Sequence, residues 1–166
     1  ARILRDGKVT VVPAMSELET LEVRGLKLEA FLSDGCRSLL DLPVQNLVEK
    51  TMRYPGHIAK MEALKEAGKF SDEKLVETTK ELAEAWRPKE NFRDLLVMRV
   101  INRGVLKGKR VEEVLETLDK FDESRGETAM SRTTGFSCSA VAQIVANGIF
   151  SEKGVFPPEK LGFNDD

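Results

Sequence analysis

Apolar and polar residues alternate along the first third of the chain, and a period of two predicts β-strands. In Leu26–Leu32, four apolar residues fall on one face, namely Leu26, Leu28, Ala30 and Leu32, while Lys27 and Glu29 fall on the other. Short Gly-containing turns between such runs predict hairpins. We therefore expect two hairpins and one further strand, namely Arg2–Leu4 with Lys8–Val12 around Asp6-Gly7, Leu18–Val23 with Leu26–Leu32 around Arg24-Gly25, and Asn46–Arg53.

The middle and the end of the chain change to apolar residues three and four apart, which predicts helices. Gly68 stands where a helix C-cap belongs, and Pro88 is placed to stop the second helix. The first turn of the second helix carries Asp72 and Glu73, which suit the helix dipole. The predicted helices are Ile58–Ala67, Ser71–Trp86 and Thr128–Gly148, with one further helical turn after Pro158.

Two segments between these helices complete the fold prediction. Asp94–Asn102 is apolar at nearly every position, so we expect a central strand buried on both faces, followed by a turn over Gly104–Gly108. In Arg110–Phe121 the apolar residues recur at helical spacing, although a strand, a turn and this segment would also make a hairpin. Strands, then helices, then strands predict an α+β fold with a mixed or mostly antiparallel sheet and helices packed on one face.

Composition narrows the function classes. The 166 residues fit one domain, 1–166, with 41% hydrophobic and 33% charged residues, as in ordinary globular proteins. A net charge of −2 gives no electrostatic case for nucleic acid. No apolar stretch is long enough to span a membrane, and no signal peptide is visible. Cys36 and Cys138 match no metal or redox spacing, so we expect free thiols in the cytoplasm.

Self-sufficient catalytic motifs are absent from the sequence. No Gly-x-Gly-x-x-Gly fingerprint, Walker A loop, His-Glu-x-x-His or Gly-x-Ser-x-Gly occurs. One histidine excludes a multi-histidine metal site, and we expect no metal. The chain also starts at Ala1 without an initiator methionine, which suggests a fragment or a domain that begins elsewhere.

Four short polar clusters favour chemistry beyond packing, each with an ordinary structural alternative. Ser33–Ser38 follows a strand and also fits a turn with a helix cap. Thr51–His57 places Arg53 and His57 at a strand-to-helix junction, where a guanidinium and free amides suit a carboxylate, and it also fits a surface arginine with a capping histidine. Thr128–Phe136 combines hydroxyls and Arg132 at a helix start, and it also fits N-terminal capping. Val155–Glu159 fits a rigid turn with proline at a helix start.

Taken in order, five segments resemble the C-terminal part of saccharopine dehydrogenase family proteins, with lysine 6-dehydrogenases the most similar. They cover nearly the whole chain at the family's usual spacing, and their specificity comes from five matches in register. They are Ala1–Lys8 "ARILRDGK", Ala30–Leu39 "AFLSDGCRSL", Thr51–Lys60 "TMRYPGHIAK", Ala129–Phe136 "AMSRTTGF" and Gly154–Gly162 "GVFPPEKLG".

The resemblance implies the domain context of this chain. Family members hold NAD or NADP in an N-terminal Rossmann domain, which is absent from this chain, and their following α+β domain binds substrate and typically forms a homodimer. It also implies that Arg110–Phe121 forms a β-hairpin with the strand before it, and we adopt this in place of the helix that local spacing favours.

The implied reaction is oxidation of a C–N bond of lysine, saccharopine or a related compound, followed by imine hydrolysis. We assign the substrate carboxylate first to Arg53 and then to Arg132, with Thr133 and Thr134 as hydrogen-bond donors. His57 would accept the amine proton or, as we favour slightly, donate to the carboxylate. The Ser33–Ser38 cluster supplies two further substrate-binding candidates: Asp34, as a partner for the substrate ammonium, and Arg37.

Two questions stay open at the level of sequence. Lysine, saccharopine and polyamine-type members share these segments, so the substrate is not separated. The residue that discriminates NAD from NADP belongs to the Rossmann domain. The alternative from another class is a non-catalytic module of the same fold that binds an amino acid or mediates association.

Overall fold

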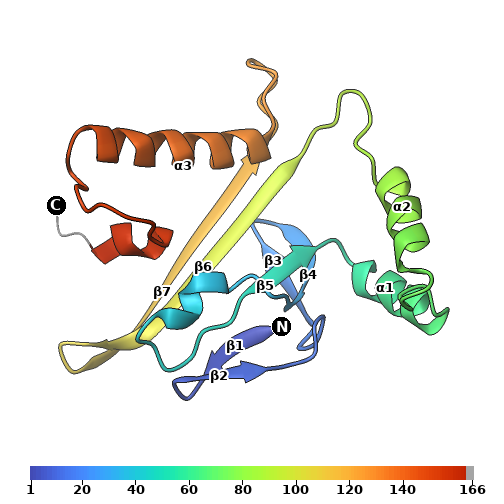
Figure 1. The fold of residues 1–166 in the computed structure, drawn as a ribbon, viewed down its shortest axis with the longest axis horizontal. Coiled ribbons are helices and arrows are strands. Elements are labelled where there is room, and N and C mark those ends of the chain that lie inside the picture. Colours follow the sequence, from blue (N-terminus) through green and yellow to red (C-terminus); the bar gives the residue numbers. More distant parts are fainter. Residues whose placement is uncertain (164–166) are drawn as a thin grey trace.

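Two tight hairpins open the chain in the computed structural model, which describes residues 1–163 (Figure 1). β1 (Arg2–Arg5) pairs with β2 (Lys8–Val11), and β3 (Glu19–Val23) pairs with β4 (Leu26–Leu32), both antiparallel. Each turn has positive φ at both central residues, 49° and 72° in the first, which suits the twist of the flanking strands. Both predicted hairpins are confirmed.

β5 (Lys50–Arg53) pairs antiparallel with β4, which gives a three-stranded sheet in the order β3-β4-β5. It is shorter than the predicted Asn46–Arg53, because Leu47 forms an isolated bridge with Leu4 of β1 instead. The Leu4 amide donates to the Leu47 carbonyl at 2.9 Å. This bridge joins the first hairpin to the segment that leads into β5.

The buried core lies within these strands and the helix that follows them. Ile3, Val23 and Leu32 have no exposed surface. α1 (His57–Glu66) adds Ile58 and Met61 to the same core. α2 (Leu75–Ala85) follows after a turn, so it starts four residues later than predicted. Burial of these apolar side chains is the main stabilising term of the domain.

β6 (Leu95–Leu106) and β7 (Lys109–Lys120) form a long antiparallel ribbon that turns at Lys107-Gly108. The hairpin implied by the family resemblance is confirmed, and the helix favoured by local spacing is wrong. Two further expectations are corrected. Gly104 lies within β6 rather than in a turn, and β6 is not a central strand, because within residues 1–163 it pairs with β7 alone.

The exposure of β6 has a physical reason in its cross-strand partners. Arg99 and Arg103 face Glu116 and Glu112 across the ribbon and pair with them, on the face that also carries Ile101. These charged side chains are exposed to solvent at positions where a fully buried strand would carry apolar side chains. Most of β6 and β7 is therefore exposed.

α3 (Ala129–Ala146) lies across one side of the ribbon and the N-terminal sheets lie on the other (Figure 1). The ion pairs support this arrangement. Arg132 of α3 binds Asp119, while Arg24 of the β3–β4 turn pairs with Glu116. The side chains of Asp119 and Glu116 point to opposite faces of the ribbon. The α+β fold is confirmed, with small antiparallel sheets in place of one sheet.

The end of the described chain returns to the first third. After α3 the chain runs back along it to a 3-10 segment, Pro158–Phe163, the predicted helical turn (Figure 1). Ser38 donates its hydroxyl to the Glu159 carboxylate at 3.0 Å. No helix within residues 1–163 combines the length and the apolar character that crossing a membrane requires.

Candidate functional site

A cleft of about 500 Å³ opens where the end of β5 meets the start of β6. It is lined on one side by strand residues of the N-terminal sheet and on the other by the entry to the ribbon, with α3 contributing one side chain. Its lining residues are Leu28, Lys50, Thr51, Met52, Arg53, Tyr54, Phe92, Arg93, Asp94, Leu95, Leu96, Val97 and Met130. A mainly apolar cleft with a few placed polar groups is the usual form of a small-molecule site.

Arg53 is the predicted carboxylate ligand that lines this cleft. It ends β5, its side chain is exposed, and its guanidinium donates to the neighbouring Met52 carbonyl at 2.8 Å. Most arginines in the described chain pair with a carboxylate, as Arg93 does with Glu123 at the same cleft. Arg53 makes no such pair within residues 1–163, so its remaining N–H donors are available to an anionic ligand.

His57 lies four residues after Arg53, at the start of α1, and it is half-buried outside the cleft lining. Its ring stacks on Phe31 at a centroid distance of 5.8 Å and meets Trp86 at 6.0 Å. Burial lowers the pKa of His57, and the positive charges of Arg53 and Lys60 lower it further against the raising effect of Glu29. The imidazole is therefore neutral at pH 7 and able to donate one hydrogen bond and accept another.

The amides at the start of α1 are already used. Glu29 of β4 accepts from the Gly56 amide at 2.8 Å and from the Ile58 amide at 3.5 Å. Gly56 takes a φ of 95°, a left-handed conformation that favours glycine. The free amides that the sequence suggested for an anion at this junction are thus engaged by a carboxylate from within the chain.

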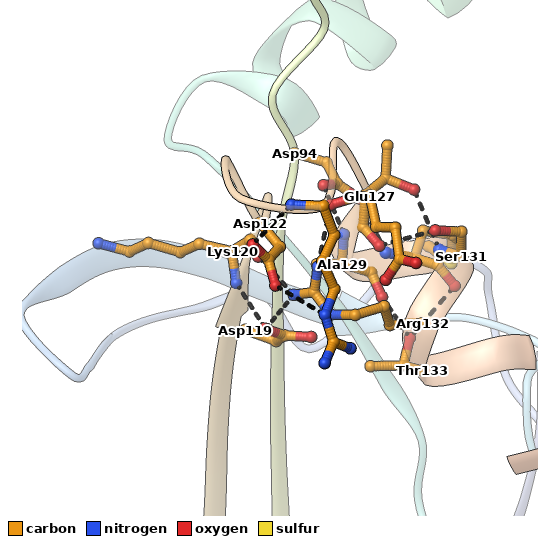
Figure 2. Close-up of polar contacts among 12 residues, drawn as sticks. Asp94, Asp119, Lys120, Asp122, Glu127, Ala129, Ser131, Arg132 and Thr133 are labelled. Carbon is orange, nitrogen blue, oxygen red and sulfur yellow. Dashed lines mark hydrogen bonds and ion pairs between the residues drawn. The ribbon is translucent and has the colours of Figure 1, made fainter. Parts of the chain in front are cut away.

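The start of α3 repeats this arrangement. Asp94, the residue before β6, accepts from the Ala129 amide at 2.7 Å and from the Met130 amide at 2.8 Å (Figure 2). Thr128 is the N-cap, and its hydroxyl accepts from the Ser131 amide at 3.1 Å. Burial acts to raise the pKa of Asp94, but the hydrogen bonds from Met130 and Ala129 outweigh it and the pKa is lowered.

Arg132 holds α3 to the ribbon (Figure 2). Its guanidinium donates to Asp119 at 2.6 Å, to the Lys120 carbonyl at 2.6 Å and to the Glu127 carbonyl at 2.9 Å. Its side chain is only 13% exposed. Thr133 donates to the Ala129 carbonyl at 2.9 Å, and Thr134 contacts the Met130 sulfur at 3.8 Å. All three side chains therefore have partners within their own part of the fold.

The loop after β4 is held in the same way. Asp34 accepts hydrogen bonds from the guanidinium of Arg2 at 2.8 Å and from the Arg2 amide at 2.9 Å. The hydrogen bond from this guanidinium lowers the pKa of Asp34 to about 2. Cys36 is buried, which raises the pKa of its thiol, and both Cys36 and Cys138 are free. Arg37 is exposed and makes no ion pair in the described part of the chain.

The whole chain, residues 1–166, matches the family model described as the saccharopine dehydrogenase C-terminal domain. The chain belongs to this family. Saccharopine dehydrogenases and their relatives are NAD(P)-dependent oxidoreductases, so this chain is a domain of that class of enzyme. The resemblance inferred from the five segments is confirmed.

In this saccharopine dehydrogenase C-terminal domain, the predicted site residues divide into two groups. Arg53 lines the cleft, and Met130 of the "AMSRTTGF" segment lines it too. The other predicted residues do not belong to its lining, namely His57, Arg132, Thr133, Thr134, Asp34 and Arg37. The end of β5 and the start of α3 both line this cleft, but α3 reaches it through Met130 rather than through its hydroxyls.

Sequence reasoning missed several residues of this saccharopine dehydrogenase domain that line the cleft. Phe92, Arg93 and Asp94 directly precede a strand, and their polar–aromatic run before an apolar strand was the available signal. Met130 stood inside a quoted segment, but an apolar residue in an apolar helix carries no distinguishing pattern. These residues meet β5 residues only in the folded chain, where both groups line the cleft.

Within residues 1–163, the structure shows neither a metal-binding cluster nor a dinucleotide-binding unit. The 163 described residues hold no group of three side chains suited to a metal ion. All strand pairs among them are antiparallel. The parallel strand–helix unit with a Gly-rich turn that binds dinucleotides is thus not among them, and we assign no cofactor contact to this domain.

Proposed function

We propose that this domain binds the amino-acid substrate of a nicotinamide-dependent dehydrogenase that oxidises a C–N bond of lysine, saccharopine or a related compound. The supporting observation is the unpaired Arg53 guanidinium on the mainly apolar cleft of a saccharopine dehydrogenase C-terminal domain. In the proposed enzyme a Rossmann domain holds NAD or NADP, which accepts the hydride. We place the enzyme in the cytoplasm.

The proposed role of the cleft is to fix one end of the substrate. The reaction requires a neutral amine, whereas a free lysine amine has a pKa of about 10.4. Holding the distant carboxylate orients the reacting carbon and nitrogen, which is a large part of the rate enhancement in such reactions. Arg53 supplies the two-pronged donor for that carboxylate. Apolar neighbours such as Leu28, Met52 and Phe92 accommodate the aliphatic chain.

His57 is proposed as the second polar group of this junction. Its lowered pKa keeps the ring neutral, so it can donate a hydrogen bond to the substrate carboxylate, the role we favour, or accept the amine proton. Because Trp86 and Phe31 hold the ring from two sides, a rotation toward the cleft would have to break one of these contacts.

The remaining predicted residues stay in the proposal with lower priority. Arg132, Thr133 and Thr134 have internal partners at the start of α3, and Asp34 is paired with Arg2. A substrate group would have to displace these contacts. Arg37 is exposed and unpaired in the described chain, so it is the one of this group that is free to meet a ligand.

The alternative is a non-catalytic module that binds an amino acid or mediates association only. A screen of the enzyme that carries this chain separates the two, with lysine, saccharopine and carboxynorspermidine as substrates and NAD or NADP as acceptor. Formation of reduced nicotinamide with one of these substrates supports the dehydrogenase. A well-folded protein that reduces neither nicotinamide with any of them, yet binds one of these compounds, is the module.

A further inference from the structure

Met130 is an apolar side chain kept in solvent at the cleft. It occupies the first turn of α3, it lines the cleft, and it is 60% exposed. Burial of an apolar side chain is favourable, so an exposed methionine on a concave surface gains stability when a ligand covers it. Methionine is also flexible and polarisable, which suits contact with alkyl chains of different shapes.

Asp94 fixes the backbone of Met130 at the cleft. Its two carboxylate oxygens take the Ala129 and Met130 amides separately, at 2.7 and 2.8 Å, and Asp94 lines the same cleft. One turn of α3 later, Arg132 is bound to Asp119 and to the Lys120 carbonyl. The start of α3 is therefore held at two places, by Asp94 at the Ala129 and Met130 amides and by Asp119 at Arg132 (Figure 2).

We infer that Met130 is a specificity-determining residue that contacts the aliphatic chain of the substrate and sets the length the cleft accepts, with Asp94 as its positioning residue. This rests on the proposed function, because it takes Arg53 as the carboxylate ligand. Arg53 fixes one end of the ligand at the end of β5. Met130 and Phe92 line the same cleft from other segments of the chain, so the space between Arg53 and these two side chains limits the alkyl chain.

Competitive inhibition by norvaline, norleucine and 2-aminoheptanoate tests the inference in the active enzyme that carries this chain. Each has an α-carboxylate and an alkyl chain, and neighbours in the series differ by one methylene. A hydrophobic pocket discriminates one methylene by about tenfold or more. We expect Met130→Ala to shift the preference toward the longer inhibitor and Met130→Phe toward the shorter one, each changing the ratio of inhibition constants by about tenfold.

Phe136→Ala is the matched control, because Phe136 is also an exposed apolar residue of α3, 56% exposed, but does not line the cleft. It should leave the ratio unchanged. Equal ratios in wild type and both Met130 variants overturn the inference, and so does an active wild type that none of the three compounds inhibits. A wild type without amino-acid dehydrogenase activity instead removes the proposed function itself.

Two variants of Asp94 test its positioning role. Asp94→Asn keeps one acceptor for the helix amides, whereas Asp94→Ala keeps none. We expect the alanine variant to flatten the preference among the three inhibitors, with kcat changing less than the KM of the substrate, and the asparagine variant to restore much of the preference. An alanine variant that folds and keeps the wild-type preference assigns Asp94 to capping alone and overturns this part.

Discussion

Carboxylate side chains fix the starts of α1 and α3. Glu29 caps α1 and Asp94 caps α3, and in each case two backbone amides are taken by one carboxylate. Such contacts satisfy amides that a helix leaves unpaired. They also remove these amides as anion sites, so the recognition of a carboxylate ligand at the cleft falls to Arg53.

Replacing Arg53 tests its role directly. In the enzyme that carries this chain, Arg53→Ala should lower kcat/KM by an amount worth about 2–5 kcal/mol, the usual loss when one partner of a buried charge pair is removed. Arg53→Lys should recover only part, because an ammonium cannot form the two-pronged contact. Arg110→Ala, at an exposed arginine that makes no ion pair within residues 1–163, is the control. Unchanged kcat/KM in Arg53→Ala would falsify the assignment.

The surroundings of Gly35 predict that a side chain at this position destabilises the domain. A Cβ at Gly35 would lie 2.5 Å from the Glu49 carboxylate, which accepts from the Gly35 amide at 3.1 Å and also binds Ser33. Gly35→Ala should therefore lower the free energy of unfolding by about 1–3 kcal/mol, as expected for losing hydrogen bonds to a charged group.

Urea denaturation measures this effect against Gly104→Ala. Gly104 lies in β6 with open space around its Cβ direction and no positive φ, so that variant should be neutral or slightly stabilising. Equal unfolding free energies for the two variants would show that Glu49 moves aside at no cost.

At the scale of elements, α1 and α2 meet through His57, Trp86 and Lys60. The Trp86 ring contacts His57 at 6.0 Å and lies under the Lys60 ammonium at 5.6 Å. Since folding lowers the pKa of His57 below its ordinary value of 6.5, protonation is more favourable in the unfolded chain. The stability contributed by neutral His57 is present above pH 6.5 and is lost as pH falls through the lowered folded pKa.

We expect the free energy of unfolding to fall between about pH 7.5 and about pH 5.5 by more in wild type than in His57→Gln, which cannot titrate. Trp86 is the only tryptophan of the chain, so its fluorescence follows urea unfolding and reports on this contact. His57 faces Glu29 as well as Arg53 and Lys60, and the carboxylate opposes the shift. The same loss in both proteins would contradict the assignment of the pH dependence to His57.

Elements with short-range signals were predictable from the sequence. The turns at Asp6-Gly7 and Arg24-Gly25 fixed two hairpins, because only a few residue pairs adopt their backbone angles. β7 was not predictable in this way. Val111, Val114, Leu115 and Leu118 recur at helical spacing, yet in β7 they alternate between two faces of an exposed ribbon, and its twelve-residue pairing with β6 decides the outcome.

The candidate site shows the same division. Arg53 was identifiable because an arginine at a strand-to-helix junction stands out in sequence. Asp94 and Met130 were not identifiable, because their places depend on hydrogen bonds from the Ala129 and Met130 amides to Asp94. These bonds span 35 and 36 positions of the sequence. The prediction that β6 is buried was wrong for a related reason. The apolar content of a strand does not show whether the surface that packs against it belongs to the same chain.

At the scale of the whole molecule, the surface is large for the chain length. The accessible area is 12640 Å² for a mass of 18.5 kDa. A compact monomer of this mass exposes roughly 8,200 Å². The difference exceeds the area that a standard interface buries, about 1,200–2,000 Å². The domain thus has room for more than one partner surface, which agrees with the proposed Rossmann domain and a second copy.

The isolated domain should not bind the cofactor. Its described strands are all antiparallel and its sequence has no Gly-x-Gly-x-x-Gly, so the contacts that hold a pyrophosphate are missing. Isothermal titration with NAD and with NADP should show no binding of micromolar affinity, whereas the enzyme that also contains the Rossmann domain should bind one of them. Micromolar binding to residues 1–166 alone would place part of the cofactor site here.

A homodimer formed through the β6–β7 ribbon is the remaining prediction. One face of the ribbon exposes apolar side chains, including Leu106 at 62% and Leu115 at 54%. A self-complementary patch on a two-fold axis buries such residues twice, so one substitution changes both halves of the interface.

Light scattering at a protein concentration on the order of tens of micromolar should give twice the monomer mass. Leu106→Glu with Leu115→Glu should give a monomer with an unchanged circular dichroism spectrum, because both residues are already exposed to solvent. Val76→Glu on α2, 67% exposed, should remain a dimer. A wild-type monomer, or a ribbon variant as dimeric as the control, would place the self-association surface elsewhere.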